Sequence, residues 1–257
     1  VQTCALPIST DTEQGTDMAR FSANLGFLWS ARPLLERIEL AAQNGFKAIE
    51  LHWPYDTSAQ AVRDACQRLN LTLLAANTPL GNTQLGESGL AALRGREAEF
   101  KETFMQSLQW CLTAGATAMH VMPGVVERDA RSTQTMVANL KWASAQVPKG
   151  FTLLLEAINQ RDKPGYFYST QAQSNAIREA TGCDNVKLMF DVYHVGVAEG
   201  DILTKLAHYM SHIGHIQIAA VPSRAEPDEG EIDYPVVIQA IDQLGYTSWI
   251  GAEYKPR

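Results

Sequence analysis

Four apolar segments in the second half of the chain each lead into a side chain with an oxygen donor. The donors are Glu156 after FTLLL, Asp191 after VKLMF, Gln217 after GHI and Glu253 after SWIGA. Successive donors are 35, 26 and 36 residues apart, which is about the length of one strand, one helix and two short loops. Each segment is typical of a buried parallel strand that ends at its donor.

This spacing matters because all strands of a (β/α)8 barrel open their carboxyl ends onto one face. We therefore expect the four donors to surround one point. Two glutamates, an aspartate and an amide form an all-oxygen set with a net charge of about −3, which suits Mg²⁺ or Mn²⁺. A single carboxylate at a strand end is more often a helix cap or an ion-pair partner, but converging carboxylates repel one another without a cation. The pattern predicts a divalent metal site.

The elements that position these donors follow one repeated unit of strand, polar loop and amphipathic helix. Three predicted helices end at glycine before the next strand, at Gly45, Gly115 and Gly245, where glycine takes the left-handed conformation. We expect strands near residues 21–26, 47–51, 71–77, 117–122, 151–156, 186–191, 214–218 and 248–253. The fold class is α/β, a (β/α)8 TIM barrel. The glycine-rich residues 77–97 are expected to cover the barrel mouth.

The two ends of the chain depart from this pattern. Residues 1–17 lack helical and strand periodicity, so we expect a non-native or disordered extension, with Met18 as the native start. Residues 18–257 are expected to form a single barrel domain. The sequence stops directly after the eighth predicted strand, so we expect a barrel that lacks the final C-terminal helix. The uncovered groove beside that strand is one reason to expect a homodimer.

Composition is that of an ordinary globular enzyme of 257 residues, 46% hydrophobic and 19% charged, with a formal net charge of −7. The acidic balance disfavours nucleic acid as a partner. No apolar segment approaches the roughly 20 residues that span a bilayer, so no membrane partner is expected. The scattered cysteines indicate reduced thiols and a cytoplasmic protein. Neither a GxGxxG segment nor a glycine-lysine phosphate loop is present, so nucleotide cofactors are not indicated.

Several longer segments resemble the hydroxypyruvate isomerase family, within the xylose-isomerase-like barrel superfamily. They include FSANLGFL, ALRGRE, HVMPG, LLLEAIN, FDVYH, HIQIAAVPSRAEPDEGEIDYP and GAEYKPR. The resemblance runs from about Arg20 to Arg257. It implies that Glu156, Asp191, Gln217 and Glu253 bind the metal, and that Glu156 and Glu253 also serve as the catalytic acid/base pair. A C-terminal helix is part of the family pattern, and its absence is a departure from it.

The implied reaction moves a hydrogen between adjacent carbons of a short 2-keto acid or sugar. Removal of the proton beside a carbonyl gives an enediolate, which a divalent cation stabilises. One carboxylate takes the proton from C3 of hydroxypyruvate and an acid returns one to C2, giving tartronate semialdehyde. Each such proton transfer contributes about 10²- to 10⁴-fold to the rate. The expected activity is a metal-dependent isomerase of the aldose-ketose type.

Four further residues are expected to bind substrate. His120 ends a strand, and His194 follows Asp191 by three residues, where its imidazole can polarise a substrate oxygen. Arg224 can hold a carboxylate through two hydrogen bonds, although Glu226 or Asp228 are alternative partners for it. Lys255 shares a face with Glu253. The other histidines, His52, His208, His212 and His215, have no evident ligand partners, and Glu50 is expected to be structural.

Three alternatives to hydroxypyruvate isomerisation remain open. A 2-oxo-tetronate isomerase would use the same chemistry, so pocket size alone separates the two substrates. A sugar or inosose epimerase or dehydratase on the same barrel would need a roomier pocket with more hydroxyl partners. A zinc-dependent phosphodiesterase acting on damaged DNA would need several histidine ligands and a basic surface.

Overall fold

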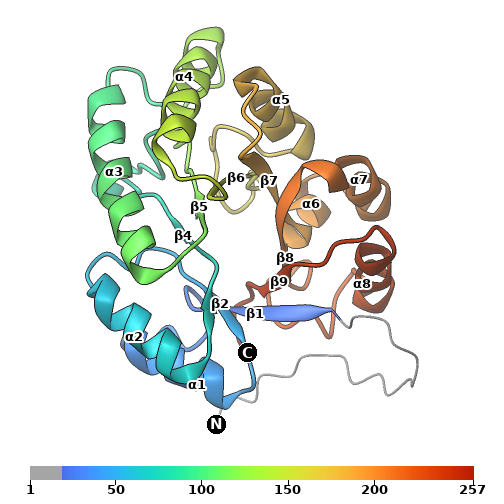
Figure 1. Cartoon of the computed structure of the whole chain (residues 1–257). Helices are drawn as coiled ribbons and strands as arrows, with labels where there is room; N and C mark the ends of the chain where they lie inside the picture. The colour runs from blue at the N-terminus through green and yellow to red at the C-terminus, as the bar shows by residue number, and fades with distance from the viewer. Residues whose placement is uncertain (1–18) are drawn as a thin grey trace.

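The computed structural model describes residues 19–257, and its strands form one parallel sheet that closes into a barrel (Figure 1). The strands are β1 (Arg20–Asn24), β2 (Ala48–Glu50), β3 (Thr72–Leu73), β4 (Ala75–Asn77), β5 (Ala118–His120), β6 (Thr152–Glu156), β7 (Val186–Asp191), β8 (Ile213–Ile218) and β9 (Trp249–Ala252). Their order in the sheet is β3-β2-β1-β9-β8-β7-β6-β5-β4. The predicted α/β barrel is confirmed.

The third predicted strand, residues 71–77, is divided at Leu74. β3 pairs with β2 and β4 pairs with β5, because the chain changes its hydrogen-bonding neighbour at this point. Backbone hydrogen bonds cross the break, from Leu74 N–H to the Ile49 carbonyl and from Leu51 N–H to the Ala75 carbonyl, both at 2.9 Å. The prediction of a single strand here is therefore wrong, but the two pieces together close the barrel.

Helices surround the strands on the outside (Figure 1). They are α1 (Leu34–Gln43), α2 (Ala59–Leu69), α3 (Glu97–Ala114), α4 (Ala130–Gln146), α5 (Gln171–Thr181), α6 (Val192–Ala198), α7 (Ile202–Tyr209) and α8 (Tyr234–Gln243), with short 3₁₀ turns at Thr83–Leu85 and Met210–His212. The predicted helix ends at glycine are confirmed, because the backbone is left-handed there, with φ of 87° at Gly45, 93° at Gly115 and 78° at Gly245.

Within residues 19–257, no helix follows β9. None of the helices in this range has both the length and the apolar character that a membrane span requires. The extension expected at residues 1–17 lies outside the described residues.

Successive side chains of a strand point to opposite faces of the sheet, and this alternation decides which of them reach the inside of the barrel. On β6, Leu153 and Leu155 pack in the main core against the helices, whereas Leu154 belongs to a separate small cluster with Met189 of β7. Because side chains two residues apart lie on one face of a strand, Glu156 shares the inner face of Leu154. Asp191 likewise shares the inner face of Met189. Both carboxylates therefore point inward at the carboxyl end of the barrel.

The glycine-rich segment between β4 and α3 is tied to the exit of β5. Ala91 N–H donates to the Met122 carbonyl at 3.3 Å, and the amide of Asn139 donates to the Ala91 carbonyl at 2.9 Å. Gly89 has a φ of 112°, and a Cβ there would overlap the Met122 carbonyl, so the close approach requires glycine. Since Leu80 lines the pocket described below, the segment forms one of its walls.

Candidate active site

The four predicted donors lie at the carboxyl ends of four adjacent strands. Glu156 is the last residue of β6, Asp191 is the last of β7, Gln217 is next to last in β8, and Glu253 directly follows β9. Asp191 and Gln217 are partners in the register between β7 and β8. All four are buried, with at most 5% of the residue surface exposed. The sequence therefore placed these side chains correctly at one end of the barrel.

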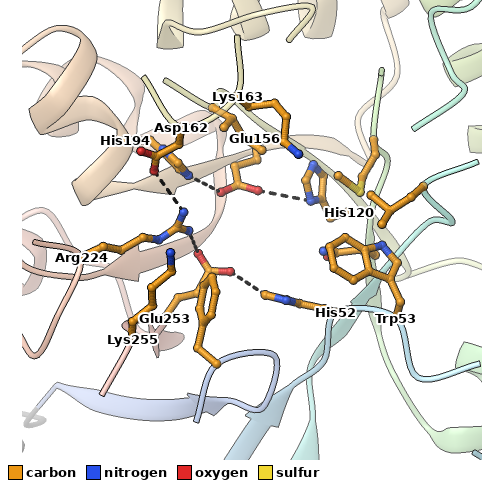
Figure 2. Close-up of a pocket in the computed structure, with 15 residues that line it drawn as sticks. His52, Trp53, His120, Glu156, Asp162, Lys163, His194, Arg224, Glu253 and Lys255 are labelled. Atoms are coloured by element: carbon orange, nitrogen blue, oxygen red, sulfur yellow. Dashed lines mark hydrogen bonds and ion pairs between the residues drawn. The ribbon is translucent and has the colours of Figure 1, made fainter. Parts of the chain in front are cut away.

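The glutamates line a pocket of about 500 Å³, and Figure 2 shows Glu156 and Glu253 facing each other across it. All four residues expected to bind substrate also line it, namely His120, His194, Arg224 and Lys255. Asp191 and Gln217 are not among the lining residues and are buried behind the pocket surface. The rest of the lining includes two residues that sequence reasoning did not assign to the site, His52 and Lys163.

Two histidines flank Glu156. One carboxylate oxygen lies 3.3 Å from Nδ1 of His120 and the other 3.6 Å from Nε2 of His194. Burial lowers the pKa of each imidazole to about 3, so both rings are neutral at neutral pH. Burial also raises the pKa of Glu156 well above its ordinary value, and the negative charges of Glu253 and Asp191 raise it further. Burial and the neighbouring carboxylates therefore both favour the neutral form of the Glu156 side chain.

Asn159 fixes the tautomer of His194. The backbone N–H of Asp162 donates to Oδ1 of Asn159 at 2.9 Å, so the amide nitrogen of Asn159 faces His194 Nδ1, at 2.7 Å. The backbone N–H of Asn159 also points to that Nδ1, at 3.3 Å. Nδ1 is therefore an acceptor, and the ring proton lies on Nε2. That N–H points to Glu156 and to Asp191, which is 3.5 Å away.

Glu253 has the opposite surroundings. Its Oε1 accepts from the amide of Asn24 at 3.1 Å and lies 2.9 Å from His52 Nε2, while its Oε2 accepts from Arg224 at 2.9 Å. Burial alone would raise the pKa of Glu253, but the His52 hydrogen bond and the Arg224 charge outweigh it and bring the pKa to about 2. Across one pocket, the two glutamates thus have pKa values displaced in opposite directions.

Arg224 is built into the site from a strained backbone. Its φ is 58°, in the left-handed region that few residues other than glycine adopt. Its guanidinium stacks between the rings of Phe27 and Tyr193, 4.9 Å from each centroid. It reaches Asp162 at 3.4 Å in addition to Glu253 (Figure 2). It also lies 3.8 Å from Asp191. Arg224 therefore neutralises part of the carboxylate cluster.

The alternative that Arg224 pairs with Glu226 or Asp228 is wrong. Those two carboxylates hold Arg257, at 3.1 Å and 2.8 Å. The left-handed backbone turns the Arg224 side chain toward the barrel mouth while its neighbours face the chain terminus. Spacing along the sequence cannot reveal this reversal, since it depends on one backbone angle.

Sequence reasoning missed His52 and Lys163 for different reasons. His52 follows Glu50 by two residues at the end of β2, so the strand-end argument applied to the other donors would also have selected it. Lys163 lies in the loop after β6, where no periodicity identifies it. Figure 2 shows its amine directed toward the space beside Glu156 and His120.

The donor set fits a divalent cation. The buried Oε1 of Gln217 has no hydrogen-bond donor among the described residues, and buried acceptors rarely remain without one. Oδ2 of Asp191 faces only the longer contacts to His194 at 3.5 Å and Arg224 at 3.8 Å. Glu156, Asp191 and His194 place one ligand atom each within 4.8 Å of one another, but the His194 tautomer presents an N–H there. Of this group, the oxygens of Glu156 and Asp191 are therefore the atoms suited to Mg²⁺ or Mn²⁺, and Gln217 and Glu253 offer further oxygens at the carboxyl ends of β8 and β9.

Known proteins match nearly the whole chain. The profile of the xylose isomerase-like TIM barrel family matches residues 38–257. The chain belongs to this family. A 2-oxo-tetronate isomerase from Cupriavidus necator is 43% identical over 93% of this chain and 94% of its own. A hydroxypyruvate isomerase from Escherichia coli is 34% identical over 93% and 95%. A solved structure from Brucella melitensis, described as AP endonuclease, family 2, has a TM-score of 0.90 at 35% identity, covering 93% and 94%. Within the xylose isomerase-like family, the two relatives named as isomerases place the chain among the isomerases.

Replacement of His52 tests the electrostatic asymmetry of the site. In metal-free His52→Leu, we expect the pKa of Glu253 to rise by about 1 unit or more, because a hydrogen bond to the charged form is lost. Because the pKa of Glu253 is lower in the folded than in the unfolded protein, its ionised form stabilises the fold at pH values above the unfolded pKa. This stabilisation is lost as the pH falls toward the folded pKa of about 2. In the variant, the stabilisation should be lost at a higher pH than in the wild-type protein. A ¹³C NMR titration of the glutamate carboxyls measures the shift, with His208→Leu on α7 as the control. An unchanged Glu253 titration would assign the whole effect to Arg224.

Proposed function

We propose that the chain interconverts a short 2-oxo acid carrying a hydroxyl on C3 with the isomer that carries the carbonyl on C3. Hydroxypyruvate and 2-oxo-tetronate both belong to this substrate class. The observation that carries the proposal is the pair of buried glutamates, Glu156 and Glu253, on opposite sides of one pocket. The identities, 43% to a 2-oxo-tetronate isomerase and 34% to a hydroxypyruvate isomerase, make the four-carbon acid the first substrate to test.

In this proposal, one glutamate accepts the proton from C3 and an acid returns a proton to C2 through an enediolate. A divalent cation held by Glu156, Asp191, Gln217 and Glu253 would supply the charge that polarises the substrate carbonyl. His120 and His194, neutral and buried, lie against that carboxyl group of Glu156 at 3.3 Å and 3.6 Å. His52 and Arg224 hold Glu253 in place from the opposite side.

Charge at the pocket supports an acid as substrate. Arg224 is already engaged by the carboxylates of Glu253, Asp162 and Asp191. Lys163 and Lys255 also line the pocket, and neither has an ion-pair partner among residues 19–257. Two such lysines can receive a substrate carboxylate, whereas a neutral sugar would leave them without a counter-charge. This observation favours a keto acid as substrate. It disfavours the alternatives in which an epimerase or dehydratase acts on a sugar or inosose.

Cleavage of DNA is not proposed, despite the description of the Brucella structure. The formal net charge is −7, which opposes binding of a polyanion. Among the described residues, the one cluster of potential metal ligands is that of Glu156, Asp191 and His194. A metal cluster held by several histidines has no counterpart in this part of the chain.

The proton transfer is tested in D₂O, with 2-oxo-tetronate or hydroxypyruvate and with Mg²⁺ or EDTA. We expect deuterium-labelled product only with metal, and restoration when metal is returned after EDTA. Glu156→Gln and Glu253→Gln should each lower kcat by about 10²- to 10⁴-fold, as expected for loss of an acid or base. Glu199→Gln, at the end of α6 outside the pocket, is the matched control. Full turnover and labelling in both glutamine variants would refute the proposal.

The charge assignment is tested with Lys163→Met. Loss of a charge-assisted hydrogen bond should raise KM for the keto acid by about 10-fold. Dihydroxyacetone carries a hydroxymethyl group where hydroxypyruvate carries its carboxylate, so its binding, measured by turnover or competitive inhibition, should not change. Lys149→Met provides the control. Equal weakening of both compounds would show that Lys163 shapes the pocket without recognising charge.

A further inference from the structure

Three polar side chains meet inside the barrel, behind the pocket. His215 and Gln217 lie two residues apart on β8, so both point inward, and both contact Glu50 from the end of β2. In the sheet order, β1 and β9 lie between β2 and β8. Gly251 of β9 leaves the necessary passage, since a Cβ there would overlap Oε1 of Glu50 and approach Cγ of Gln217 to 2.9 Å.

Hydrogen bonding to Glu50 fixes the orientation of the Gln217 amide. Oε2 of Glu50 lies 2.7 Å from Nε2 of His215 and accepts from Nε2 of Gln217 at 3.2 Å. A carboxylate offers only acceptor atoms, so the amide must turn its nitrogen toward Glu50. Its oxygen therefore points away from Glu50.

That oxygen has no donor among the described residues, although it is buried. Asp191, the register partner of Gln217 on β7, adds a buried carboxylate beside it, whose Oδ2 has only long contacts, to His194 at 3.5 Å and Arg224 at 3.8 Å. A buried amide oxygen without a donor next to a carboxylate is a poor arrangement for a core but a suitable one for a cation. A simple ion pair between Glu50 and His215 would need neither the contact with Gln217 nor the unpaired amide oxygen.

We propose that Glu50 is a positioning residue, which holds the Gln217 amide so that its oxygen is presented to a divalent cation. His215 holds Glu50 in turn, and Gly251 allows the contact across two intervening strands. The inference rests on the proposed function in one respect, that Gln217 is a metal ligand. It adds a role for Glu50 and His215, which neither contact the pocket nor belong to the donor set.

The test is Mn²⁺ binding by isothermal titration calorimetry, together with the melting temperature of the metal-free protein. In Glu50→Gln, the residue at position 50 can turn its own N–H toward Gln217 and invert that amide. We expect the Mn²⁺ Kd to rise by about 10- to 100-fold, the usual cost of losing an outer partner of a ligand. Gln217→Glu should also weaken binding, because two carboxylates then face each other.

The double variant that combines Glu50→Gln with Gln217→Glu tests whether residue 50 orients the side chain of residue 217. In this double variant, the amide at position 50 donates to the carboxylate at position 217, and His215 accepts from that amide through its other tautomer. A carboxylate oxygen of residue 217 then faces the cation. Mn²⁺ affinity should therefore return to within a few-fold of wild type. Rescue of affinity cannot come from a merely structural role, which would change the melting temperature alone. Wild-type affinity in Glu50→Gln would overturn the inference while leaving metal-dependent isomerisation intact. Failure of the wild-type protein to bind Mn²⁺ would overturn both.

Discussion

The site depends on one constraint, the burial of three carboxylates, Glu156, Asp191 and Glu253, at neighbouring strand ends. Like charges at close range in a poorly hydrated place cannot all remain ionised without compensation. Arg224 compensates part of this charge. Burial, followed by the charge of Glu253, raises the pKa of Asp191 to about 7, and Glu156 is raised as well. Binding of a cation would remove this repulsion and release protons, so metal affinity and pH are linked.

The surroundings of the carboxylates follow from that constraint. Each carboxylate has neutral or cationic neighbours that fix its direction, such as His194, whose tautomer is set by Asn159, and Arg224, which stacks between two rings. Strain in the Arg224 backbone is stored where it orients a charged group, as is common at functional sites. The apolar outer faces of the strands pack against the helices and provide the rigidity on which these distances depend.

Much of the fold and the donor set could be predicted from the sequence. Side chains alternate between the two faces of a strand, and the spacing between successive strand ends follows the length of one strand, one helix and two loops. Glu156, Asp191, Gln217 and Glu253 lie where strand ends were expected. The break at Leu74 was not foreseen, since a change of hydrogen-bonding neighbour leaves no mark in a short apolar segment. The partners of Arg224 depend on one positive φ, and the contact of Glu50 with Gln217 depends on the space at Gly251. Such features arise between distant strands and are not carried by local periodicity.

In the proposed site, the oxygens of the four strand-end residues hold one cation in an isomerase pocket. Crystals of the protein grown with Mn²⁺ and measured at a wavelength where manganese scatters anomalously test it directly. We predict one strong anomalous peak within reach of oxygens from Glu156, Asp191, Gln217 and Glu253, with His194 outside the coordination shell. No peak at this position in crystals that bind manganese elsewhere, or a peak coordinated by His194 Nε2, would contradict the claim.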